Sequence, residues 1–447
     1  MANRLRDEHR RLDELRVGDL AVRASFQVSF ASLPAEAQPD RVAPADAFRL
    51  LGLWQGPSIS SAAAAALFST PDYLASDALE TLVDAHLLES TAPDRYKFHD
   101  LLRVYSSERA VADLPEPDRD AAIGRLLRWY MRTTDAAATA VAPHRYNMPL
   151  EPASADPAPL GFAEADDALS WYDSERANVV VATRQASASG MHDVAWRLPA
   201  PLFIVFESRQ NWADLITTHR IALDSARQVG NRQGEAWLLN SLGEALGITG
   251  HSEGIDCLEQ ALDIRREIGD RMGEAQAANN LADAYQRLGR PDEAIDPLRR
   301  ALDLNRKVGY RYGEGVALVN LGDVLSKLDR TDEAIDCLQR ARSTFDEIED
   351  ADGAGYALYC LGRYYLSLGR NEDALTCLRQ ALTNHQTAGN RHRQAVTLRL
   401  LGRAEARNDL ASQARESRAR AAAIFDDLGD SAQAAEVRAE LTTSAIS

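Results

Sequence analysis

Residues 273–308 read GEAQAANNLADAYQRLGRPDEAIDPLRRALDLNRKV, and the chain repeats the pattern of this stretch about every 40 residues. One small residue keeps its place each time, at Ala261, Ala301, Ala341, Ala381 and Ala421. Two helices need small side chains where their axes cross closely, because larger ones would hold the backbones apart. A single helix pair cannot bury its apolar face alone, so these units are expected to stack into a solenoid.

Two further small positions mark each repeat. One follows a leucine about twenty residues before the alanine: Leu242-Gly243, Leu281-Ala282, Leu321-Gly322, Leu361-Gly362 and Leu401-Gly402. The other lies between them, at Gly254, Ala294, Ala334, Ala374 and Ala414. This signature resembles the tetratricopeptide repeat (TPR), in particular the long-repeat class of kinesin light chains. A period near 40 is also typical of HEAT and armadillo repeats, but the small residues favour TPR.

The fold prediction is mainly α, an α-solenoid of TPR helix pairs with a small winged-helix domain before it. Five repeats are predicted at 234–269, 273–308, 313–348, 353–388 and 393–428, which together make a domain over 234–428. Weaker helical repeats are predicted at 164–233, and a capping helix with a tail at 429–447. Ser252, Thr331 and Asn371 are expected to supply N-cap oxygens to second helices, and Pro291 an N1 proline. Gly250, Gly289 and Gly369 are expected to end first helices with a positive φ.

Composition bounds the class of protein. The net charge of −17 argues against nucleic acid or an anionic membrane as the main partner. The first sixteen residues are heavily charged, which argues against a signal peptide, and no apolar run approaches the ~20 residues that span a bilayer. We therefore expect a cytoplasmic protein. Lysine accounts for three of the 50 basic residues, which with the abundant alanine suggests a GC-rich genome such as an actinobacterium's.

The cysteines and histidines suggest neither catalysis nor a metal site. Cys257, Cys337 and Cys377 hold the same second-helix position in three repeats. Helix layers lie on the order of 10 Å apart, whereas a disulfide needs Cα atoms within about 7 Å. We expect these cysteines to be buried small residues in a reducing compartment. The nine histidines show no metal-ligand spacing.

The front of the chain has the pattern of a winged helix. Short helices are predicted at 45–54, 58–68 and 71–86, followed by a hairpin of 87–90 with 95–98, within a domain over 39–112. A helical segment at 1–38 precedes it, and a connecting helix at 113–142 and a proline-rich linker at 143–163 follow. The third helix holds four acids and neither Arg nor Lys, so DNA phosphates would repel it.

Several stretches then resemble a known family. SFQVSFASLP at 25–34, FRLLGL at 48–53, LETLVDAHLLE at 79–89 and YKFHDLLR at 96–103 look like the end of an NB-ARC module. They are most similar to the actinobacterial AfsR-type antibiotic regulators, which are STAND NTPases. The match continues through RLLRWY at 125–130 and ALSWYDSERAN at 168–178. In that family a DNA-binding domain and a nucleotide-binding core precede the winged helix and the TPR arm.

The nucleotide-binding core is missing from this match. A phosphate-binding loop needs Gly-Lys-Ser/Thr, and none of the three lysines follows a glycine. We therefore expect no enzyme activity and no cofactor, and read the chain as the carboxyl-terminal half of such a switch, either cut from it or encoded alone. Phe98-His99-Asp100 resembles the family's Met-His-Asp motif, which implies that His99 contacts an ADP phosphate when a core is present. The alternative is that His99 and Asp100 cap the helix that starts there.

The inner face of the solenoid is the candidate binding site. The residue before each repeating leucine should point inward (Ser241, Asn280, Asn320, Cys360 and Leu400), as should the one two places after it (Glu244, Asp283, Asp323, Arg363 and Arg403). The resemblance implies that Asn280 and Asn320 hydrogen-bond the backbone of an extended peptide. The face changes from acidic to basic along the chain, and Arg399 strengthens the basic end. The alternative is that these charges are solvated or form contacts between repeats.

The predicted partner-binding residues are therefore Asn280, Asn320, Arg363, Arg399 and Arg403. Arg232, Arg271 and Arg311 each precede a glutamate by three residues and are expected to form local salt bridges instead. We interpret the chain as a non-catalytic regulator whose partner is a protein or peptide, or a nucleotide-binding domain in cis or in trans. The alternatives are a transcription factor that binds DNA through the winged helix, and a fragment of an ADP/ATP-binding switch.

Overall fold

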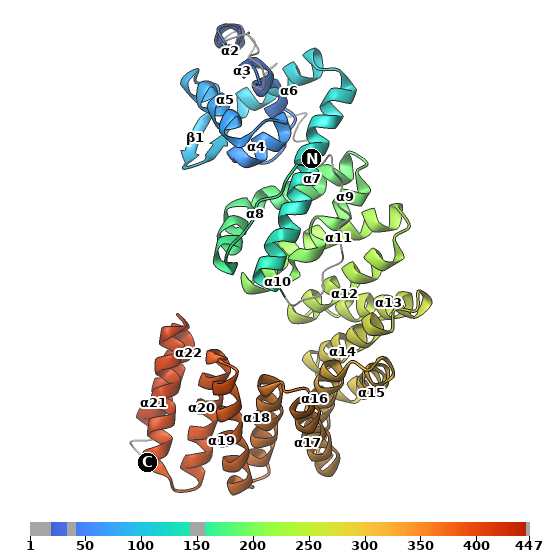
Figure 1. Ribbon diagram of the computed structural model, residues 1–447, viewed down its shortest axis with the longest axis vertical. Coiled ribbons are helices and arrows are strands. Elements are labelled where there is room, and N and C mark those ends of the chain that lie inside the picture. Colours follow the sequence, from blue (N-terminus) through green and yellow to red (C-terminus); the bar gives the residue numbers. More distant parts are fainter. Residues whose placement is uncertain (1–18, 34–41, 144–156, 444–447) are drawn as a thin grey trace. The chain divides into compact units, whose positions relative to one another are not determined.

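The structure is a computed structural model that describes residues 19–33, 42–143 and 157–443 (Figure 1). The chain divides into two compact units, residues 1–242 and 243–447. The boundary falls inside α12 (Arg232–Ile248), the first helix of the first predicted repeat. The finer division into seven segments stays a prediction.

The first unit begins with the elements of the predicted winged helix. They are α3 (Pro44–Leu51), α4 (Ser61–Phe68), α5 (Asp72–Asp84), β1 (Glu89–Ala92), β2 (Arg95–Lys97) and α6 (Asp100–Asp113), and α2 (Asp19–Ala31), from the helical segment predicted at 1–38, precedes them. The two strands pair antiparallel, with Glu89 opposite Lys97. The first strand begins two residues later than predicted. The reason is that the backbone N–H groups of Leu87 and Leu88 bond to the carbonyl of Leu82 and close the end of α5.

An aromatic cluster holds these helices together. The ring of Phe48, which is fully buried, lies 5.3 Å from that of Phe30 on α2 and 5.4 Å from that of Phe98, just after β2. Tyr105 of α6 completes the cluster, with its ring 6.1 Å from Phe48. The residues with the strongest family resemblance thus include the core of this domain.

The hairpin is fixed to the helices that follow it, α7 (Glu116–Val141) and α8 (Ala165–Ala188). Glu175 of α8 has no exposed surface, and its carboxylate accepts hydrogen bonds from Arg95 of β2 at 2.6 Å, Tyr130 at 2.9 Å and Asn178 at 2.6 Å. Trp54 stacks on Tyr130 with ring centroids 5.4 Å apart. A buried charge needs such partners, so this network ties the hairpin to α8.

The rest of the first unit is helical, as expected for the weaker repeats. It contains α9 (His192–Arg197), the short 3₁₀ helix η1 (Ala200–Leu202), α10 (Phe203–Ser208) and α11 (Trp212–Gln228). Most of the predicted linker at 143–163, and residues 1–18 and 34–38 of the predicted first segment, lie outside the described residues.

The second unit is a succession of antiparallel helix pairs, seen in yellow to red in Figure 1. Its helices are α13 (Glu253–Glu267), α14 (Arg271–Arg287), α15 (Pro291–Val308), α16 (Arg311–Lys327), α17 (Thr331–Glu347), α18 (Ala351–Ser367), α19 (Asn371–Thr387), α20 (Arg391–Arg407), α21 (Ala411–Asp427) and α22 (Ser431–Thr443). The predicted TPR solenoid is confirmed, and α15 runs unbroken through Pro297.

The small residues lie where the helices cross. Ala301 and Ala341 are fully buried. A Cβ added to Gly362 of α18 would lie 2.6 Å from Cγ of Leu378 on α19, too close for two carbon atoms. The period in the sequence therefore reports the closest approaches between helices.

The predicted helix ends are correct for the glycines and for Pro291, the first residue of α15, and wrong for the three N-cap side chains. Gly250, Gly289 and Gly369 have φ of 79°, 73° and 72°. Ser252 makes no capping hydrogen bond, while Thr331 and Asn371 lie inside their helices, one residue past the cap. The side-chain caps are on first helices instead, at Asp270, Asp350 and Asn390. The turns between repeats also have positive φ, at Gly269, Gly309, Glu349 and Gly389.

Two of the three predicted local salt bridges form. Arg232 bonds to Glu235 at 2.6 Å, and Arg311 pairs with Glu314. Glu274 instead pairs with Arg266 at 2.8 Å and Arg300 at 2.9 Å, and not with Arg271. All three glutamates are buried, and an arginine from the preceding helix bonds to each. These pairs therefore join the repeats.

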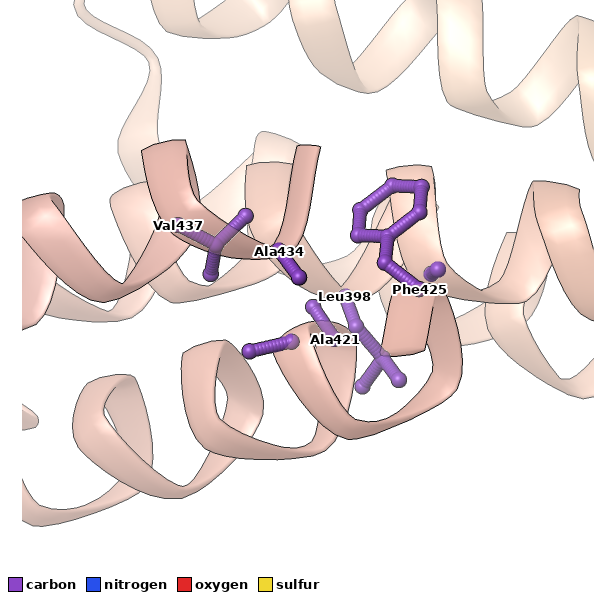
Figure 2. Close-up of a cluster of buried hydrophobic side chains, with 7 residues drawn as sticks. Leu398, Ala421, Phe425, Ala434 and Val437 are labelled. Carbon is purple, nitrogen blue, oxygen red and sulfur yellow. The ribbon is translucent and has the colours of Figure 1, made fainter. Parts of the chain in front are cut away.

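The last three helices share one core. Figure 2 shows Leu398 of α20, Ala421 and Phe425 of α21, and Ala434 and Val437 of α22 packed together. Helix α22 begins 40 residues after α20, so it takes the place of a first helix in a further repeat. The predicted capping helix is thus continuous with the solenoid; residues 444–447 lie outside the described residues.

Candidate binding face of the solenoid

The first-helix face is the set of positions just before and two after each repeating leucine. The structure places the two predicted asparagines on neighbouring first helices with different surroundings. Asn280 on α14 is half-buried and donates to Oε2 of Glu244 on α12 at 3.0 Å. Asn320 on α16 is also half-buried, and no hydrogen bond joins its side chain to any described residue. The amide of Asn320 is therefore the better placed of the two to meet a partner.

Arg363 sits at the point where the face changes sign. It is exposed, forms an ion pair with Asp323 of α16, and lies with its guanidinium 6.0 Å from the ring of Tyr359. Asp323 also pairs with Lys327 at 2.9 Å. The last acid and the first base of the face thus neutralise each other.

The basic end of the face is occupied by α22. Oε1 of Glu440 lies 2.7 Å from Arg399 and 2.6 Å from Arg403. Arg399 also bonds to Glu436 at 3.0 Å and to Gln433 at 2.9 Å. Burial of Glu440 acts in the opposite direction, but the hydrogen bonds from Arg403 and Arg399 hold the pKa of its carboxyl below the ordinary value. The structure thus brings the predicted binding residues Arg399 and Arg403 together, and both bind the carboxylate of Glu440 from the same chain.

For Arg363, Arg399 and Arg403 the structure therefore shows contacts between neighbouring first helices, the alternative that the sequence left open. Their arrangement follows the period, because each arginine pairs with an acid 37 to 41 residues away. The role of these residues in binding a partner stays a prediction.

Two tyrosines on α18, the helix that carries Arg363, were not identified from the sequence as candidate binding residues. Tyr356 and Tyr359 of α18 stack with ring centroids 6.2 Å apart, and 38% of Tyr356 is exposed. Arg393 lies 4.5 Å over the Tyr356 ring, and it also pairs with Asp352, which bonds to the buried His385. The available signal was their position, five and two residues before Leu361. An aromatic pair with one exposed ring beside arginines is well suited to contact a peptide.

A cavity of about 250 Å³ opens among residues of α16, α17 and α18. It is lined by Asp323, Ser326, Lys327, Leu338, Cys360, Arg363, Tyr364 and Ser367. Burial raises the pKa of the Cys360 thiol to about 11, so the sulfur stays protonated at neutral pH and is a poor nucleophile. The cavity thus offers a ligand a defined shape and hydrogen-bonding groups, without a reactive thiol.

The cysteines are free, as expected, and Cys257 and Cys337 are buried. Cys377 is half-buried, which differs from the prediction. Among the described residues no three His, Cys, Asp or Glu side chains gather as they would around a metal ion. No helix in the described ranges is both long and apolar enough to cross a membrane.

His99 and the third helix of the winged helix both face solvent. α6 begins at Asp100, but the exposed His99 side chain makes no capping bond and has no hydrogen-bond partner among the described residues. On α5, Asp72, Asp77, Glu80 and Asp84 are all exposed. The surface that a winged helix would turn to DNA is therefore acidic.

Comparison with known proteins supports the repeat prediction and the family resemblance. The tetratricopeptide repeat family model matches residues 250–307 and 313–387. The protein described as regulatory protein AfsR from Streptomyces griseus is 36% identical over 252 residues, and that from Streptomyces coelicolor is 38% identical over 261 residues. These alignments cover 56% and 57% of this chain, and 25% of each relative.

The chain is homologous to AfsR regulators over about half its length, so the resemblance seen in the sequence is confirmed; it matches a quarter of those proteins. A solved structure with a similar fold is a signal transduction ATPase with numerous domains (STAND) that has a tetratricopeptide repeat sensor, from Pyrococcus horikoshii. It has a TM-score of 0.45 and 14% identity, and the match covers 89% of this chain and 62% of that one.

Proposed function

We propose that this homologue of the AfsR regulators is a non-catalytic sensor arm, which acts in the cytoplasm and binds a protein or peptide on its first-helix face. The homology supports a regulatory role, and the TPR solenoid supplies a long surface made of equivalent helices. A surface of this kind is suited to holding an extended ligand.

The observation that carries the proposal is the pair Asn320 and Tyr356, on neighbouring first helices. The amide of Asn320 has no partner among the described residues, and Tyr356 is partly exposed. A peptide backbone has donors and acceptors that an amide can match, and its side chains can pack on the ring. Arg363, on the same helix as Tyr356, would meet an acidic side chain or a terminal carboxylate.

The proposal is tested by capturing a partner from cytoplasm and then titrating the purified pair. Arg363→Ala with Arg403→Ala should weaken binding by roughly tenfold or more, because hydrogen bonds to charged groups contribute about 1.5–3 kcal/mol each. Asn320→Ala with Tyr356→Ala should also weaken binding by roughly tenfold, because it removes a backbone hydrogen bond and the ring on which side chains pack. The arginine effect should shrink at high salt. Arg340→Ala with Arg379→Ala, on second helices, is the matched control. Equal affinities for all variants would place the site elsewhere.

The acidic helix α5 argues that the partner is not DNA. Four exposed carboxylates repel phosphates, and Arg95 of the hairpin is committed to the buried Glu175. The chain is expected to show no salt-dependent binding to duplex DNA in fluorescence anisotropy. Micromolar binding at physiological salt would favour the alternative, a DNA-binding regulator.

A nucleotide-binding domain, in cis or in trans, is a second candidate partner. The exposed His99 imidazole is available to such a domain, and its proposed contact with an ADP phosphate needs that domain to complete the site. By itself the chain is expected not to bind or hydrolyse ATP. Calorimetry that showed micromolar ATP affinity would contradict this.

A further inference from the structure

Helix α22 places carboxylates where the proposed partner would place its own. The helix occupies the position of a first helix, so Glu440 continues the series Ser241, Asn280, Asn320, Cys360 and Leu400 by forty residues. Its carboxylate bonds to both Arg399 and Arg403, which lie one turn apart on α20. The pair of arginines is thus an anion site, and a carboxylate of the same chain already fills it.

The acids of α22 are held by ion pairs with α20, while the helix itself is held by its core. Ala434 and Val437 are fully buried against Leu398 and Phe425, on the side of α22 seen in Figure 2. The side chains of Glu436 and Arg403 are 59% and 50% exposed, whereas those of Arg399 and Glu440 are only 21% and 23% exposed. Glu436 can therefore turn away from Arg399, and Arg403 from Glu440, while α22 stays packed.

The ion pairs Arg399–Glu436 and Arg403–Glu440 each have one exposed partner, which makes them weak enough to exchange. Exposed pairs typically contribute about 0–1 kcal/mol each, and an incoming carboxylate would replace the same hydrogen bonds. The arginines are oriented in advance, because Glu440 and Gln433 hold Arg399 in place from two directions. A ligand that replaced Glu440 would meet arginines already aimed at a carboxylate.

We propose that Glu436 and Glu440 are built-in competitors for the anion site of Arg399 and Arg403, and that the partner reaching this site is an acidic segment that displaces them. This inference rests on the proposed function, and it adds a partner class and a means of control. Only a ligand with carboxylates spaced to engage both arginines displaces the acids of α22. Neutral or basic segments cannot replace these carboxylates, so they gain no affinity at the anion site.

A labelled, N-acetylated hexaglutamate peptide tests the inference without the natural partner. In fluorescence anisotropy at low salt, E436Q/E440Q should bind this peptide on the order of tenfold tighter than the wild type does, because three ion pairs to Arg399 and Arg403 no longer compete. Hexaglutamine should bind neither protein. Adding R399Q and R403Q to the double variant should abolish the gain.

The matched control is E293Q/E333Q, which removes two exposed glutamates that pair with Arg290 and Arg330 on second helices. It makes the same change in net charge and should leave the affinity close to wild type. Equal gains in both double variants, a gain that survives loss of the arginines, or no peptide binding to any variant would each overturn the inference. Circular dichroism checks that the variants fold, and E440Q alone, the milder change, should give part of the gain.

The two proposals fail separately. A natural partner that responds to the Asn320 and Tyr356 variants but not to E436Q/E440Q would leave the proposed function standing and remove the competition. If E436Q/E440Q bound hexaglutamate more tightly but the natural partner responded to no substitution on the first-helix face, the competition would stand and the proposed function would fall.

Discussion

Arg95 of the hairpin donates to Oε1 of Glu175 at 2.6 Å, and the Glu175 side chain has no exposed surface. Tyr130 and Asn178 complete the partners of this carboxylate. The residue that a DNA-binding wing would offer to a phosphate is therefore turned inward. It joins the winged helix to the next helices of the same unit.

Glu175→Ala should destabilise the first unit by about 3–5 kcal/mol, because it leaves Arg95 without its buried partner. All six tryptophans lie within residues 1–242, so urea unfolding followed by tryptophan fluorescence reports on this unit. Asp173→Asn is the control on the same helix. It breaks the exposed pair with Arg209 and should cost under about 1 kcal/mol. Similar costs would show that the Glu175 network is not a structural anchor.

The buried His219 on α11 should make the first unit sensitive to acid. Burial lowers the pKa of this imidazole from 6.5 to about 4. Between pH 6.5 and about pH 4, His219 is protonated in the unfolded chain and neutral in the folded chain. The free energy of unfolding therefore decreases as the pH falls through this range. The contribution is on the order of 3 kcal/mol between pH 7 and pH 4. The difference in unfolding free energy between wild type and His219→Leu should change by about that amount. A difference independent of pH would contradict this.

Ala301→Leu or Ala341→Leu should destabilise the solenoid by about 1–3 kcal/mol, because both residues lie fully buried at close helix crossings. Ala406→Leu makes the same change at an exposed position of α20 and should cost under about 0.5 kcal/mol. Far-UV circular dichroism during thermal unfolding gives the comparison. If all three melting shifts were equal, the crossings would not be where the repeat places them.

Glu314 tests the junctions between repeats. This buried carboxylate is held by Arg306 of α15 at 2.7 Å and by Arg311 of its own helix. Glu314→Ala is expected to cost about 1–3 kcal/mol, because it removes the acceptor of two charged hydrogen bonds. Glu333→Ala removes an exposed partner of Arg330 and should have a much smaller effect. Urea unfolding followed by circular dichroism would measure both.

The sequence predicts the solenoid well because the small residues report directly on where helices cross. It predicts caps less well, since Thr331 or Asn371 can supply an oxygen from the cap or from the first helical turn, and the pattern does not fix the phase to one residue. The self-occupied anion site was missed for another reason. Glu440 lies 41 residues from Arg399, so the pairing depends on three-dimensional stacking. Extending the series of Asn320 and Leu400 by one period would have located it.

The turns between repeats carry a consequence for how such a protein can change over time. Gly269, Gly309, Glu349 and Gly389 stand 40 residues apart and share a left-handed backbone. Recombination between two of these turns would remove or duplicate one whole module, and the new junction would have the geometry of the old one. Each module contacts mainly its neighbours, so the other crossings would survive. The length of ligand that the solenoid can contact could thus change by one repeat at a time, without a change of fold.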